Sequence, residues 1–134
     1  MDRAAYDRYL TAFNARDYDG VLAHFADSFE LSFGGYMFRT KDAVRQLYAF
    51  LHAHVNERIT VHRFVSDART VAMEADVRLE ALDDMTPEML AEAGLGKLQP
   101  MTRGQIITIP QFIHYHLDAD GKIVRALCAI FEPA

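Results

Sequence analysis

Histidine and tyrosine side chains are the first candidates for acid–base chemistry in this sequence. His114 and His116 flank Tyr115 in an apolar run near the end of the chain. Histidine can take up or release a proton near neutral pH, which suits it to general acid–base catalysis. Because side chains alternate along a strand, both histidines would lie on the face opposite Ile113 and Tyr115. His114 is therefore either an acid–base residue or a structural or subunit-interface residue.

The other histidines of interest occupy an expected strand and an expected helix. His62 lies beside Phe64 in the middle of a strand, from which it could reach a pocket. His52 and His54 lie one residue either side of Ala53 on a helix, where we expect both to be partly solvated. His62 is therefore a candidate ligand contact, and the other two are not.

No set of side chains has the spacing of a metal site. Cys128 is the only cysteine of the sequence, which argues against a disulfide within it and against a cysteine-rich zinc site. His114 and His116 could supply two metal ligands, but no third ligand at a recognised spacing accompanies them. We expect no bound metal and no cofactor.

Composition and charge narrow the classes of partner. The sequence has 134 residues, 51% of them hydrophobic, which suits one domain over residues 1–134. A net charge of −5, with no run among its 14 Lys and Arg residues, argues against nucleic-acid binding. The longest apolar run, 126–131, is much shorter than the roughly 18 to 20 residues that span a bilayer. We expect a cytoplasmic protein whose partners are small molecules or other proteins.

Helical periodicity dominates the first half of the chain. Apolar residues at helical spacing predict a first helix around residues 6–13 and a short second helix, capped by Asp17, whose buried face includes Phe25. A third helix, capped by Thr40, has an apolar stripe that extends to Val55. Between the second and third helices, residues 29–33 alternate between apolar and polar, and two glycines predict a tight hairpin.

The second half alternates with the period of strands. Strands are expected over residues 59–65, 71–80, 104–117 and 122–132, with Val65 on the same face as Ile59 and Val61 and with Pro110 at a bulge or an edge. Residues 83–103 interrupt the pattern, contain a helix-start signal at Thr86, and are expected to form a lid-like insertion. These elements predict an α+β domain. Its curved antiparallel sheet of about four to six strands would wrap against three helices and enclose a pocket.

The segment YLTAFNARDYDGVLAHFAD, residues 9–27, resembles the opening of ketosteroid isomerases and SnoaL-like proteins of the nuclear transport factor 2-like superfamily. The shared pattern is a helix ending in Asn-x-x-Asp-x-Asp, followed by a short helix ending in Phe-x-Asp. Residues 107–112 and 120–124 also resemble the closing hairpin of SnoaL-like proteins. The resemblance implies a cystatin-like cone with an apolar pocket.

The resemblance also assigns positions to catalytic side chains. Tyr9 falls where ketosteroid isomerases keep the tyrosine that donates a hydrogen bond to an enolate oxygen. The general base of these isomerases falls on Phe33, and the second pocket acid falls on Ile113 or His114. The carboxylate of dehydratase relatives falls on Asn14. The usual family carboxylates are therefore absent from their usual positions.

These observations yield a candidate site and three functional hypotheses. The candidate catalytic residues are Tyr9, which could instead be an ordinary core tyrosine, and His114; the candidate ligand contacts are Phe33, His62, Gln111, Ile113 and Tyr115. The first hypothesis is an isomerase or cyclase acting on a hydrophobic carbonyl compound, such as a polyketide or a steroid-like ring. The alternatives are a non-catalytic binder of an apolar ligand and a dimerisation module with a vestigial cavity. A base within hydrogen-bonding reach of the Tyr9 side of the pocket would favour the enzyme.

We predict a homodimer that pairs through the sheet. Phe112 and Ile130 would add to an apolar patch on the sheet face that the helices leave uncovered. The resemblance points the same way, because such relatives commonly pair through their sheets. Light scattering at micromolar concentration should give the mass of two chains. A mass of one chain would contradict the prediction.

Overall fold

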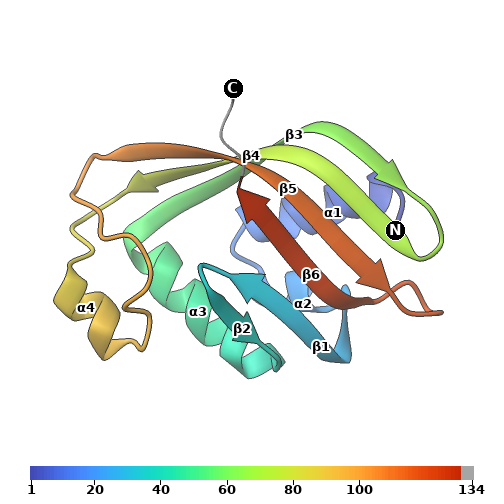
Figure 1. Cartoon of the computed structure of the whole chain (residues 1–134), viewed down its shortest axis with the longest axis horizontal. Helices are drawn as coiled ribbons and strands as arrows, with labels where there is room; N and C mark the ends of the chain where they lie inside the picture. The colour runs from blue at the N-terminus through green and yellow to red at the C-terminus, as the bar shows by residue number, and fades with distance from the viewer. Residues whose placement is uncertain (131–134) are drawn as a thin grey trace.

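The computed structural model describes residues 1–130 and confirms the α+β class (Figure 1). The elements in chain order are α1 (Arg3–Asn14), α2 (Tyr18–Leu22), β1 (Phe25–Phe33), β2 (Tyr36–Phe38), α3 (Lys41–His54), β3 (Val55–Ser66), β4 (Thr70–Ala81), α4 (Pro87–Glu92), β5 (Ile106–Leu117) and β6 (Ile123–Ile130). Residues 131 and 132 of the expected last strand lie outside the described residues.

The six strands form one sheet in the order β2-β1-β6-β5-β4-β3. Every neighbouring pair is antiparallel except β1 and β6, which run parallel, with Leu31 opposite Ala126. The expected all-antiparallel sheet is therefore corrected to a mixed one. Alternation of apolar residues shows which face of a strand is buried, but it carries no information about the direction of the neighbouring strand.

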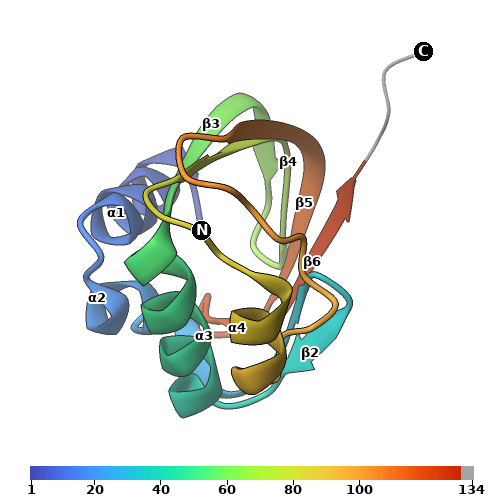
Figure 2. The ribbon, with the colours of Figure 1, turned by 90° about the vertical axis from the view of Figure 1, so that its left-hand side faces the viewer.

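The helices lie on the concave side of the sheet. Figure 2 shows the long strands β3, β4 and β5 curving over α1, α2 and α3.

Within residues 1–130, no helix is long and apolar enough to cross a membrane. Phe112, with 47% of its area exposed, lies on the face that the helices leave uncovered. The expectation that Ile130 adds to that patch is wrong, because Ile130 pairs with Gln111 and lines a cavity with it on the concave side. The homodimer stays a prediction.

The predicted helix starts are confirmed, but two helix ends differ from expectation. The Asp17 side chain accepts a hydrogen bond from the Gly20 amide at 2.9 Å, and the Thr40 hydroxyl accepts one from the Ala43 amide at 3.1 Å. Phe25, expected on the second helix, begins β1, and Val55, expected on the third, begins β3. Val55 misled the prediction because it points inward both in the helical repeat of α3 and in the strand repeat of β3.

A bulge in β3 changes which side chains face the core. The pairing of β3 with β4 shifts register between Val61 and Arg63. Beyond the shift Phe64 packs against the core, whereas Val65 is 67% exposed. The expectation that Val65 shares a face with Ile59 and Val61 is wrong, because an extra residue in one strand reverses the alternation that follows it.

The pairing with β4 has no bulge at Pro110, and the described part of β6 ends one residue short of it. The pairing of β4 with β5 continues in register through Asp76 and Pro110. On its other side, β5 pairs with β6 from Gln111 onward in the described residues. Pro110 therefore lies where that pairing begins, and its missing N–H removes no described bond to β6.

The segment 83–103 crosses one end of the sheet and returns. A bridge between Met85 and Met101 closes its base, and Thr86 caps α4 by accepting a hydrogen bond from the Met89 amide at 3.2 Å. The Lys97 amide donates a hydrogen bond to the Tyr36 hydroxyl at 3.0 Å. This last contact ties the segment to the β1–β2 hairpin.

The hairpin glycines provide a test of that packing. Gly34 and Gly35 have positive φ values of 56° and 85°, as a tight turn between paired Phe33 and Tyr36 requires. A Cβ on Gly34 would lie 2.2 Å from Leu98 Cδ2, whereas Gly94, with φ of 73°, has open space.

Gly34→Ala should lower the free energy of unfolding more than Gly94→Ala does. Both variants acquire left-handed strain of about 1 kcal/mol, but only alanine at position 34 must also displace the Leu98 side chain. Urea unfolding of both variants and the wild type would measure the difference. Equal losses of stability would mean that Leu98 does not pack against the hairpin.

Candidate functional site

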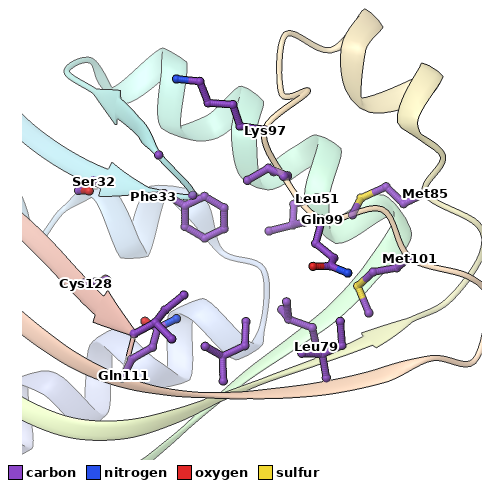
Figure 3. A pocket seen from close by; sticks show the side chains of 16 residues that line it. Ser32, Phe33, Leu51, Leu79, Met85, Lys97, Gln99, Met101, Gln111 and Cys128 are labelled. Carbon is purple, nitrogen blue, oxygen red and sulfur yellow. The ribbon is translucent and has the colours of Figure 1, made fainter. Parts of the chain in front are cut away.

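A cavity of about 460 Å³ opens between the insertion and the concave face of the sheet (Figure 3). Its apolar walls come from β1, α3, β4 and β5 and from the insertion, and include Phe33, Leu51, Leu79, Met85, Met101 and Ile107. Its polar lining includes Gln99, Gln111 and Lys97. We call this space the outer cavity.

A second space of about 50 Å³, the inner cavity, lies deeper in the cone. It shares four lining residues with the outer cavity: Ser32, Phe33, Gln111 and Cys128. Three tyrosines from three elements also line it: Tyr9 of α1, Tyr48 of α3 and Tyr115 of β5. The inner cavity has room for roughly three to five water molecules.

Most of the sequence-predicted site residues lie at these cavities. Tyr9, Ile113 and Tyr115 line the inner cavity, and Phe33 and Gln111 line both. Strand alternation brings residues 111, 113 and 115 to one face of β5.

The structure does not bring His62 or His114 to either cavity. His62 is exposed on the β3 bulge, and its Nε2 lies 2.9 Å from Asp76 Oδ2. His114 alternates with Ile113 and Tyr115 on the other face of β5, where its ring lies 4.8 Å from that of His116. In both strands, side-chain alternation directs the histidine away from the concave face.

The residue that sequence reasoning missed is Glu57. Within residues 1–130 it is the one buried acidic residue, with 4% of its area exposed, and it lines the inner cavity. It lies on β3 in the inward phase between Val55 and Ile59. The sequence pattern that indicates its burial is a carboxylate in the inward phase of an otherwise apolar strand. That pattern is recognised only when Val55 is placed on the strand and not on the preceding helix.

Glu57 is held from two directions. Its Oε1 lies 2.9 Å from His52 Nε2, and its backbone carbonyl accepts a hydrogen bond from Arg16 Nη2 at 3.2 Å. Arg16 Nη2 also donates to Asn56 Oδ1 at 2.9 Å. Within the described chain, no other side chain donates to the Glu57 carboxylate. The second oxygen, Oε2, has no side-chain donor among the described residues.

His52 is buried, contrary to the expectation of partial solvation. Its side chain is 2% exposed and stacks on Tyr48 with 5.2 Å between ring centroids. Its Nδ1 lies 2.9 Å from the hydroxyl of Tyr18. The position of His52 in the sequence indicates this burial, because it lies one helical turn after Tyr48 and continues the apolar stripe of α3.

The three inner tyrosines remain protonated at neutral pH. Burial raises the pKa of Tyr9, Tyr48 and Tyr115, and the nearby Glu57 charge raises the pKa of Tyr9 and Tyr48 further. The Tyr115 hydroxyl partly offsets this effect on the pKa of Tyr9. A phenol that keeps its proton can donate a hydrogen bond to a ligand oxygen. The inner cavity therefore combines one carboxylate with three phenol donors.

The described residues contain no group of three or more His, Cys, Asp or Glu side chains that could hold a metal ion. The expected absence of metal stays a prediction.

Comparisons with known proteins place the chain in a family. The sequence profile described as the SnoaL-like domain matches residues 6–126. A comparison with functionally curated proteins found no match.

Solved structures show the same fold. One is a provisionally assigned polyketide cyclase from Silicibacter, with 23% identity over 96% of this chain and 87% of that one, and a TM-score of 0.72. Another is a SnoaL-like polyketide cyclase from Agrobacterium tumefaciens, with 18% identity over 96% and 89% and a TM-score of 0.69. A third is an LEH-like epoxide hydrolase from M. tuberculosis, with 17% identity over 96% and 80% and a TM-score of 0.68. At these identities the likeness establishes the fold alone.

Cys128 should report on occupancy of the cavities. Although Cys128 is exposed, it lines both cavities, and desolvation of the thiol there, helped by the charge of Glu57, raises the pKa of Cys128 to about 11. Because the thiolate is the reactive form, iodoacetamide should label Cys128 slowly at pH 8 and much faster as the pH rises toward 11. A ligand in the cavities should slow the labelling at every pH. Labelling at pH 8 as fast as that of N-acetylcysteine would contradict the prediction.

Proposed function

Because this chain belongs to the SnoaL-like domain family, we propose that it is a proton-transfer enzyme that acts on an apolar carbonyl compound. The observation that carries the proposal is the position of Glu57, a buried carboxylate at the inner cavity among protonated tyrosines. Enolisation needs a base for the α-proton and a donor for the developing oxyanion. Glu57 and the tyrosines are groups of these two kinds.

Each group has a defined part in the reaction. Glu57 Oε2 accepts a proton from the carbon next to the carbonyl, the C–H electron pair moves into the new C=C bond, and the carbonyl oxygen becomes negative. The hydroxyl of Tyr9 donates a hydrogen bond to that oxygen. Where a C=C bond adjoins the α-carbon, the enolate is a dienolate, and return of the proton to its far carbon shifts that double bond and completes an isomerisation. Attack of the enolate carbon on a second carbonyl closes a ring instead, and the new alkoxide takes the proton from Glu57.

The sizes of the two cavities support a particular class of substrate. The inner cavity, at about 50 Å³, accepts only a carbonyl and the few atoms next to it. The outer cavity, at about 460 Å³, accepts a larger apolar body against Phe33, Leu79 and Met101. The substrate is therefore a bulky apolar molecule whose reactive carbonyl lies at one narrow end.

A non-catalytic binder is the second candidate. The apolar lining and size of the outer cavity suit binding whether or not a reaction follows. The distinction between the two candidates depends on whether Glu57 takes a proton from a bound ketone.

The test follows proton–deuterium exchange at the α-carbon of 1-tetralone, an apolar ketone, by NMR in D₂O. The wild type should accelerate the exchange, and Glu57→Gln should lower the rate about 100-fold or more, because the amide is not a base. Glu30→Gln is the matched control. Glu30 lies on β1 beside Arg125, its Oε2 3.8 Å from Arg125 Nε, and it lines neither cavity.

Binding of 2-naphthol, whose hydroxyl mimics an enolate oxygen, separates the two candidates. Binding without accelerated exchange would overturn the enzyme and favour the binder. Equal exchange rates in the Glu57→Gln and Glu30→Gln variants would remove Glu57 from the reaction.

A further inference from the structure

A chain of two polar side chains, the buried His52 and the half-buried Tyr18, stands behind Glu57, on the side away from the cavities. Glu57 Oε1 lies 2.9 Å from His52 Nε2, and His52 Nδ1 lies 2.9 Å from the hydroxyl of Tyr18. The Tyr18 hydroxyl also lies 3.2 Å from the backbone carbonyl of Tyr48, so its single proton is directed to either that carbonyl or His52 Nδ1. Neither His52 nor Tyr18 lines a cavity. These two residues can therefore act on a substrate only through Glu57.

Aromatic rings hold the imidazole of His52 in place. Tyr48 stacks on it at an interplanar angle of 4°, and Phe13 meets it edge-on at 90°, with 5.4 Å between ring centroids. Tyr18 stacks at 5.8 Å. These contacts hold the plane of the imidazole, and the Tyr18 hydroxyl holds Nδ1. The Nε2 atom of His52 is therefore directed toward Glu57.

The hydrogen-bonding capacity of each group decides which atom donates. An ionised carboxylate only accepts hydrogen bonds, so Nε2 must carry the proton between His52 and Glu57. Tyr18 donates its one proton to Nδ1 when that nitrogen carries none; when Nδ1 is protonated, Tyr18 accepts from it and donates to the Tyr48 carbonyl. The carboxylate is 5% exposed and depends on this donor, because a buried carboxylate without a partner is strongly destabilised.

We propose that Tyr18 and His52 are positioning residues: they hold Glu57 Oε1 so that Oε2 meets the substrate in the inner cavity. This inference rests on the proposed function, because it takes Glu57 as the base. Loss of the Nε2 donor frees the carboxylate to turn, and the geometry for proton transfer is lost. The affinity of the outer cavity is unaffected, because its lining includes neither residue.

The experiment compares two substitutions of one histidine. In His52→Gln the side-chain amide can place an N–H donor near the position of Nε2, whereas the shorter amide of His52→Asn cannot reach it. His54→Asn is the matched control, since His54, two residues later on α3, pairs with Asp83 at 2.7 Å near the surface. Tyr18→Phe removes the hydroxyl that contacts Nδ1 and retains the ring.

Saturating 1-tetralone exchange rates and 2-naphthol dissociation constants are measured for each variant. His52→Asn and Tyr18→Phe should lower the saturating rate about ten- to a hundredfold and leave naphthol affinity unchanged. His52→Gln should recover a substantial part of the rate, and His54→Asn should match the wild type. A parallel loss of rate and naphthol affinity, or equal rates in His52→Gln and His52→Asn, would indicate a packing role and overturn the proposal.

A spectroscopic readout separates this inference from the proposed function. In ¹H–¹⁵N correlation spectra of the wild type, His52 should show a slowly exchanging proton on Nε2, whether or not the protein turns over 1-tetralone. Nε2 without a proton would overturn the positioning role. Absence of wild-type exchange would overturn the proposed function alone. Loss of exchange in Glu57→Gln with full exchange in His52→Asn would overturn the positioning role alone.

Discussion

Burial of one carboxylate is the constraint on which the candidate site depends. Transfer of an isolated charge from water to a protein interior costs several kcal/mol even after relaxation, so the charge must be paired and hydrogen-bonded. Glu57 meets this requirement through His52, five residues earlier in the chain. The pairing needs α3 to pass directly into β3, and no loop separates His54 from Val55. The histidine and the carboxylate are thus fixed on either side of one junction.

Neighbouring elements support the same junction. Arg16, with a positive φ of 59°, lies between α1 and α2 and reaches the Glu57 carbonyl and the Asn56 side chain of β3. Tyr18 reaches α3 through His52 and the Tyr48 carbonyl. The segment from Arg16 to Tyr18 therefore contacts both the end of α3 and the start of β3, which carries the Glu57 side of the inner cavity.

The low polarity around Glu57 makes burial of its charge unfavourable, but it also strengthens the electrostatic interactions in the site. Around the inner cavity, burial keeps the phenols of Tyr9, Tyr48 and Tyr115 protonated, so that they donate hydrogen bonds. The insertion lines the outer cavity with apolar side chains such as Leu98 and Met101. Electrostatic interactions are stronger among buried groups than in bulk water, which is why the proposed reaction needs only one carboxylate and a few phenols.

The sequence by itself determined the elements and most of the cavity lining, because both follow from local periodicity. Residues 111, 113 and 115 face the cone because strands alternate, Asp17 and Thr40 begin helices because their side chains cap them, and two glycines at positive φ close the first hairpin. The family resemblance placed Tyr9 on the inward face of α1. These features need no knowledge of distant contacts.

Tertiary structure decided the remaining features. The direction in which β1 pairs with β6 and the bulge that turns Val65 outward depend on neighbouring strands. The carboxylate of the site depends on where α3 ends, since a shift of one residue at Val55 decides whether Glu57 is recognised as inward-facing. His52 and Glu57 each resemble surface residues when taken alone. Only the packing of α3 against β3 joins them, because burial of each is favourable when the other is its partner.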